Sequence, residues 1–132
     1  KPIVLTDNLD FYGHLVQGYR QEADKHGTKV ARGQEAAWGG ICICAPTDAQ
    51  AKEWLQDMLW FWNSWAVPFG QGLPELLVGS PDTISRRLDE VKQRFPDQDE
   101  VFLLIPQGIH GRDQILTSLD LMAKHVLPRF AS

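Results

Sequence analysis

Cysteine, basic charge and long apolar runs are all scarce in this 132-residue chain, and each scarcity excludes a class of protein. The two cysteines, Cys42 and Cys44, lie two apart in one apolar run, where neighbours on the same strand rarely form a disulfide. We therefore expect free, buried thiols and a reducing, cytoplasmic location. No apolar run reaches the length that spans a bilayer, and no signal peptide is visible, so we expect no membrane partner.

The charge pattern argues against nucleic acid and against a metal site. The formal net charge is −4, from 13 Lys and Arg against 17 Asp and Glu, and the two signs are interspersed. There is no basic stripe with aromatic residues between the charges, so we expect no nucleic-acid partner. His14, His26 and His125 fall on predicted helices without the spacing of metal ligands, so no metal is predicted.

What is present is an ordinary globular composition, with 43% hydrophobic and 23% charged residues in the length of one domain. The first residue is Lys1, which is not a natural start. We therefore expect the chain to be trimmed or cut from something larger.

Helix and strand signals alternate along the chain. Continuous apolar runs at 39–45 and 101–105 are typical of strands covered on both faces of a parallel sheet, and a weaker run at 3–5 indicates the end of a third strand. Apolar residues at helical spacing predict four helices. These helices cover residues 8–26, 47–62, 81–95 and 112–127.

The helix over 47–62 has the clearest signal. Thr47 and Gln50 have the spacing of a capping box, and Trp54 lies in the middle of the apolar stripe, where it should be core. The segment 63–79 has no clear period and is rich in Trp, Phe, Pro and Gly, which predicts a long loop. Long loops inside compact domains are usually functional or mobile.

Strands alternating with helices predict an α/β fold with a parallel sheet. Two strong strands and a weak third, flanked by four helices, make an incomplete sheet whose open edges invite pairing. We therefore expect a piece of a larger α/β fold that associates as a homo-oligomer.

Five segments, taken in order, carry a resemblance to a known family. They read "GYRQEADKHG" (18–27), "ICICAPTDAQAKE" (41–53), "LLVGSPDTISRRLDEV" (76–91), "VFLLIPQG" (101–108) and "LTSLDLMAKHVLPRF" (116–130). Their order and spacing resemble the C-terminal end of the luciferase-like flavin-dependent monooxygenases, across nearly the whole chain.

The resemblance implies the C-terminal portion of a (β/α)8 TIM barrel within an oxidoreductase that uses FMN, or a deazaflavin, on a small apolar substrate. Residues that hold the flavin in that family lie mostly earlier in the chain, so none can be assigned here. The resemblance therefore also implies that the isolated 132-residue chain is inactive. The alternative is a stand-alone, non-catalytic α/β binding or assembly module derived from such a barrel. The reading frame separates the two, because an intact barrel needs about 200 further residues upstream.

Four candidate sites follow, each with a structural alternative. Gly79-Ser80-Pro81 resembles a phosphate cradle, but Pro81 has no N–H and Asp82 is negative, which favours a helix cap. Trp65 and Phe69, with Phe61, are candidates for a lid over the active-site mouth, against local packing of the tryptophans.

His110 and Arg112 follow the strand at 101–105 and would face the mouth of a complete barrel, although loop residues of this kind are more often merely exposed. Cys42 and Cys44 are expected to pack in the core, with a place near the flavin as the lesser alternative.

Overall fold

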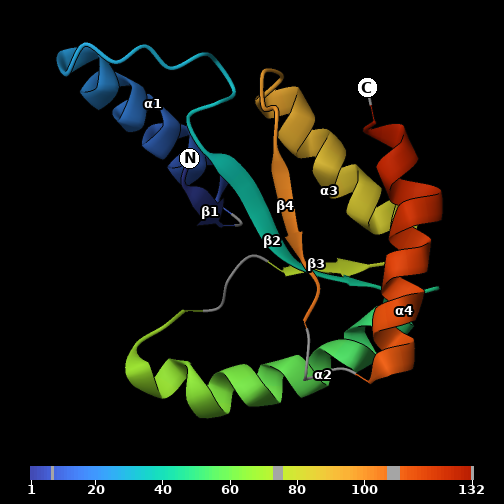
Figure 1. The fold of residues 1–132 in the computed structure, drawn as a ribbon. Coiled ribbons are helices and arrows are strands. Elements are labelled where there is room, and N and C mark those ends of the chain that lie inside the picture. Colours follow the sequence, from blue (N-terminus) through green and yellow to red (C-terminus); the bar gives the residue numbers. More distant parts are fainter. Residues whose placement is uncertain (7, 73–75, 107–110, 132) are drawn as a thin grey trace.

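The computed structural model describes residues 1–6, 8–72, 76–106 and 111–131, in which parallel strands alternate with helices (Figure 1). The strands are β1 (Ile3–Leu5), β2 (Ala37–Cys44), β3 (Leu76–Gly79) and β4 (Val101–Leu104). The helices are α1 (Leu9–Lys25), α2 (Asp48–Trp65), α3 (Pro81–Arg94) and α4 (Arg112–Leu121). A 3-10 turn, η1 (Val67–Phe69), follows α2, and a π-helical turn, η2 (Met122–Val126), and a 3-10 turn, η3 (Leu127–Arg129), extend α4.

β2 is the centre of the sheet, because each of the other three strands pairs with it in parallel. Trp38 pairs with residues of both β1 and β4, and Ile41 pairs with residues of both β3 and β4. A strand has two edges, so β4 occupies one edge of β2, and β1 and β3 follow each other along the other edge.

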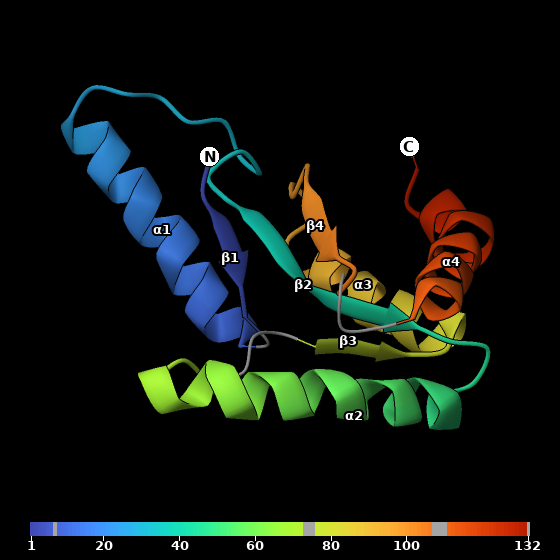
Figure 2. The same cartoon turned by 60° about the horizontal axis from the view of Figure 1, so that its bottom comes forward.

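The helices cover both faces of this sheet (Figure 2). On one face, Trp38, Cys42 and Cys44 pack with residues of α1, α3 and η2. On the other face, Ile41 and Ile43 pack with Met58 of α2. This division follows from right-handed crossovers: the connection from β2 back to the edge of β1 puts α2 on the face opposite to the other helices.

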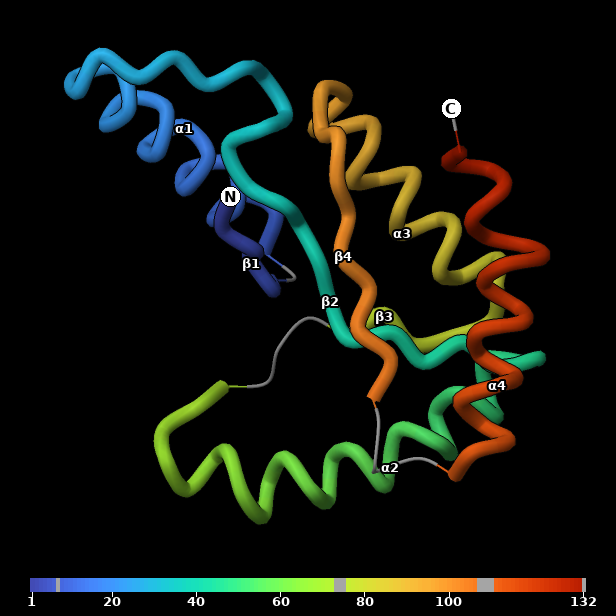
Figure 3. The backbone as a smooth tube through the Cα atoms, viewed as in Figure 1, coloured from blue at the N-terminus to red at the C-terminus, as the bar shows by residue number. Residues whose placement is uncertain are grey.

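The larger core cluster is closed by the C-terminal segment, which runs beside α3 (Figure 3). The phenol ring of Tyr12 is fully buried there and meets Phe95 edge to face, with 5.0 Å between ring centroids. The Tyr12 hydroxyl lies 2.9 Å from the Ala36 carbonyl oxygen, and burial raises the Tyr12 pKa to about 12.

Half of the face that carries α2 has no cover among the described residues. Ile3 and Leu5 of β1 and Phe102 and Leu104 of β4 flank β2 on this face and are 51%, 39%, 39% and 42% exposed. We call these four residues the open half-face. α2 covers only the other half, next to β3.

The structure confirms the parallel α/β fold, as in part of a TIM barrel, and corrects several boundaries. The segment 63–79 is not one long loop: α2 continues to Trp65, η1 follows, and Leu76–Gly79 form a fourth strand. This strand escaped sequence reasoning because its short apolar run adjoins a Pro/Gly-rich segment, while its hydrogen bonds depend on pairing with β2. The prediction that 101–105 is covered on both faces is also wrong, since Phe102 and Leu104 are exposed.

Candidate functional site

Parallel α/β sheets place their chemistry at the carboxyl ends of the strands. At this edge β2 and β3 end together, with Cys44 paired to Gly79 and the Ala45 N–H donating to the Gly79 carbonyl at 3.1 Å. Ser118 in α4 donates to the Cys44 carbonyl at 2.6 Å. The ends of two strands and the beginning of three helices therefore form one polar edge.

The carboxylate of Asp48, at the start of α2, links this edge together. Its Oδ1 accepts a hydrogen bond of 2.7 Å from the Ser80 backbone N–H, and its Oδ2 accepts one of 3.1 Å from the Thr83 hydroxyl. The Ser80 N–H, followed by the Thr83 hydroxyl, holds the pKa of Asp48 below its usual value. Asp48 thus supplies the negative charge that the N-terminus of α3 favours.

This contact decides the role of Gly79-Ser80-Pro81. α3 begins at Pro81, as predicted, and the place where a phosphate would lie is filled by the Asp48 carboxylate. A Cβ on Gly79 would come within 2.9 Å of Asp48 Oδ1 and 2.7 Å of Thr83 Cγ2. The motif is therefore a helix start with an internal anion. Sequence reasoning missed Asp48 because nothing local to 47–50 points to a partner 32 residues away.

The other two helix starts at this edge are also capped. At α2 the Thr47 hydroxyl accepts from the Gln50 N–H at 3.2 Å, as the capping box predicts. At α4 the Gln114 side chain accepts from the Gly111 N–H at 2.8 Å. Arg112 is the exposed first residue of α4, and its place at the mouth of a complete barrel stays a prediction. His110 falls outside the described residues.

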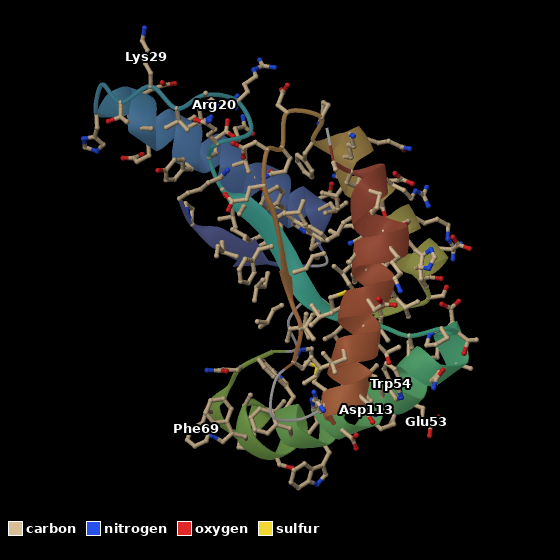
Figure 4. The ribbon with its side chains drawn as sticks, turned by 45° about the vertical axis from the view of Figure 1, so that its right-hand side comes forward. Arg20, Lys29, Glu53, Trp54, Phe69 and Asp113 are labelled. Atoms are coloured by element: carbon tan, nitrogen blue, oxygen red, sulfur yellow. The ribbon has the colours of Figure 1, made fainter. Side chains whose placement is uncertain are left out.

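The aromatic candidates lie elsewhere. Trp65 ends α2 and Phe69 ends η1, on the side where β3 begins, and they are 56% and 78% exposed. α2 has 18 residues and is thus about 27 Å long, which separates them from Asp48. In Figure 4 Phe69 lies at the opposite end of α2 from Glu53, Trp54 and Asp113. Trp65 stacks on Phe61 at 5.7 Å, which is the local packing alternative, and the lid role stays a prediction.

The cysteines are core residues. Cys42 and Cys44 are both fully buried, and burial raises their pKa values to about 12 and about 11. The Cys42 thiol lies 3.8 Å from the Met122 sulfur. Both are protonated at neutral pH and are poor nucleophiles. Among the described residues no group of three or more His, Cys, Asp or Glu could hold a metal ion, and no helix there is long and apolar enough to cross a bilayer.

Comparison with solved structures places the fold. The chain superposes over 98% of its length, with a TM-score of 0.76 and 20% identity, on the oxygenating constituent of 3,6-diketocamphane monooxygenase from the CAM plasmid of Pseudomonas putida, a type II Baeyer-Villiger monooxygenase in complex with FMN. It also superposes on the monooxygenase RslO1 from Streptomyces bottropensis (88% of this chain, TM-score 0.61, 20% identity) and on apo-MsnO8 (85%, 0.53, 17%).

This chain spans only 42%, 37% and 40% of those three chains. No protein-family model and no curated protein sequence matches it. The resemblance to luciferase-like flavin monooxygenases that the sequence indicated is therefore confirmed at the level of the fold: the chain has the fold of less than half of such an enzyme.

Proposed function

We propose that this chain is the C-terminal part of an FMN-dependent, luciferase-like monooxygenase. The observation that supports this most is the superposition of nearly the whole chain on 42% of a monooxygenase complexed with FMN. In such an enzyme the flavin supplies the oxidative chemistry, and the protein excludes water and positions a small apolar substrate. We choose FMN over a deazaflavin because the neighbouring structure contains FMN.

At the carboxyl edge of the sheet, the described residues do not by themselves fit FMN. Its phosphate needs a cradle of free donors, and the N-terminus of α3 is already occupied by Asp48. The role of this chain is therefore to complete the barrel wall, with Arg112 at the mouth. The flavin would be held by parts of the barrel that this chain does not include.

The open half-face supports a role as part of a larger barrel. Four large apolar side chains on one sheet face remain 39–51% exposed, at a cost of roughly 25 cal/mol for each square ångström of apolar surface. Further strands and helices of a barrel would bury them. The test is the polypeptide in which the segment occurs: we expect about 200 further upstream residues and one FMN bound per polypeptide. A polypeptide that begins at this segment and lacks flavin would contradict the proposal.

The isolated chain should not bind the isoalloxazine ring of the flavin. We expect no saturable change in FMN fluorescence when FMN or reduced FMN is titrated with the 132-residue chain, because no phosphate cradle is open at the carboxyl edge of the sheet. Micromolar binding with one site per chain that excess inorganic phosphate does not displace would show that this segment carries the flavin site, and would overturn the proposal that other parts of the barrel hold the flavin.

One observation favours the alternative of a stand-alone binding module. A groove of about 520 Å³ lies between α3, β4 and η3, at the end where β4 begins, and its walls include Leu88, Val91, Leu103 and Phe130. The reading frame again separates the alternatives, since a stand-alone module would have its own start at this segment.

A further inference from the structure

A second pocket, far from the carboxyl edge of the sheet, has a concentration of arginine. It has a volume of about 270 Å³ and lies between the C-terminal half of α1, the segment before β2 and the segment 94–98 after α3. Arg20, Arg32 and Arg94 line it, which is three of the seven arginines in a chain whose net charge is −4. Figure 4 shows Arg20 at the opposite end of the molecule from Asp113.

The acidic residues in and beside this pocket engage only some of the N–H donors of its three arginines. Glu35, only 2% exposed, is ion-paired with Arg20, so its charge is compensated within the pocket wall. Asp97 lies 4.0 Å from the nearest Arg32 nitrogen, beyond hydrogen-bonding distance. The Asp10 carboxylate contacts one nitrogen of the Arg94 guanidinium. A guanidinium has five N–H donors, so most of them stay available.

One of the unused donors is buried. Arg20 Nε has no hydrogen-bond partner among the described residues, although water cannot reach it. This nitrogen is as closed to a ligand oxygen as it is to water. The donors open to a ligand are the other guanidinium nitrogens, because the side chains of Arg20, Arg32 and Arg94 are 36%, 77% and 44% exposed and guanidinium groups bind phosphate oxygens in a bidentate manner.

The walls of the pocket are fixed by backbone contact. Gly33 has φ of +84°, and a Cβ there would lie 1.4 Å from the Asp97 carbonyl oxygen, so only glycine allows the two segments to approach. Next to this contact, Gln98 Nε2 donates to the Ala36 carbonyl at 2.8 Å. The backbone that carries Arg32 and Arg94 is therefore fixed in position by these contacts.

We propose that this pocket is a binding site for a small tetrahedral oxyanion, either free phosphate or the phosphate group of a phosphomonoester, held by Arg20, Arg32 and Arg94. The site lies at the end of the sheet where β2 begins, opposite to the carboxyl ends of the strands. A ligand there would tie α1 to the segment that follows α3.

The test is a titration of the folded chain with inorganic phosphate at constant ionic strength, followed by calorimetry and thermal melting. We expect saturable binding, and a rise of the melting temperature that equimolar chloride does not produce. Methyl phosphate is the second probe: binding as tight as that of phosphate means that the site accepts phosphomonoesters, and much weaker binding means that it takes the free anion.

Variants separate the pocket from general electrostatics. Arg32→Gln should weaken phosphate binding at least about tenfold, the effect of losing one charge-assisted contact. Lys29→Gln is the matched control, because it removes a nearby positive charge that does not line the pocket. Arg20→Gln is avoided, since it would leave Glu35 buried without its partner. Absence of saturable binding by either probe, or equal weakening by Lys29→Gln and Arg32→Gln, would overturn the proposal.

Discussion

The Asp48 carboxylate makes a contact that can be tested by pH. Its folded-state pKa is lowered from 3.8, mainly by the Ser80 N–H, so its stabilising effect is complete above the unfolded pKa and is lost as the pH falls through the folded pKa. We expect Asp48→Asn to lower the melting temperature at pH 7 and to approach wild type below about pH 4.

Asp57→Asn is the control for that experiment, because Asp57 is an exposed carboxylate in the same helix. Its melting temperature should follow that of wild type at every pH. If Asp48→Asn and wild type differ by a constant amount down to strongly acidic pH, the ionised carboxylate is not what links α2 to α3.

Packing at single residues distinguishes Met58 from Trp54. Trp54 is half-buried against the cluster formed by Ile41, Ile43 and Met58. Its place in the apolar stripe predicts full burial, which is wrong, whereas Met58 is only 1% exposed. We expect Met58→Ala to cost about 2–5 kcal/mol and Trp54→Ala less than the about 3–5 kcal/mol of a fully buried aromatic. The exposed Arg86→Ala should cost under about 0.5 kcal/mol. Urea melts measure all three, and equal midpoints for Met58→Ala and Arg86→Ala would mean that the buried face of α2 is misassigned.

At the scale of the element, the pairing of β4 with β2 depends on a glycine. A Cβ on Gly39 would lie 2.3 Å from the Phe102 carbonyl oxygen, so Gly39→Ala must push the two strands apart. We expect a loss of about 1–3 kcal/mol in the free energy of unfolding, as for other overpacked sites.

Gly18 is the matched glycine for this comparison, since it lies in α1 and a Cβ there meets nothing within 4 Å. Gly18→Ala should stabilise by about 0.5–1 kcal/mol, because alanine is the better helix former. Should the two substitutions change stability in the same direction, the close approach of β4 to β2 is wrong.

At the scale of the whole molecule, the open half-face should drive association. We expect the chain to form dimers or larger oligomers in light scattering across a dilution series, because burying apolar surface is favourable and β4 has one edge without a strand partner among the described residues. Leu104→Lys places a charge in the middle of this surface and should shift the equilibrium towards monomer.

Gln93→Lys, an exposed change of the same charge on α3, controls for the added charge and should associate as wild type does. A compact monomer at all concentrations with a cooperative melt would show that the chain tolerates its open half-face, and the interpretation as part of a larger barrel would lose its physical support.

The sequence by itself determined which segments become helices and strands wherever the signal was local. Asn8 caps α1, Thr47 caps α2 and Pro81 begins α3 at the positions that their side chains dictate. Such contacts involve residues three apart, so composition and spacing are sufficient to predict them. The parallel α/β class followed in the same way from the order of the apolar segments.

Tertiary structure alone decided what depends on distant partners. β3 exists because Leu76–Gly79 pair with β2, and the order of the strands follows from the residues of β2 that pair on both edges. Asp48 caps the N-terminus of α3 only because the fold brings it to Ser80, 32 residues away. The three pocket arginines come together only when α1 and α3 pack beside the start of β2. Periodicity describes one element at a time, whereas these features arise from hydrogen bonds and charges that are joined across elements.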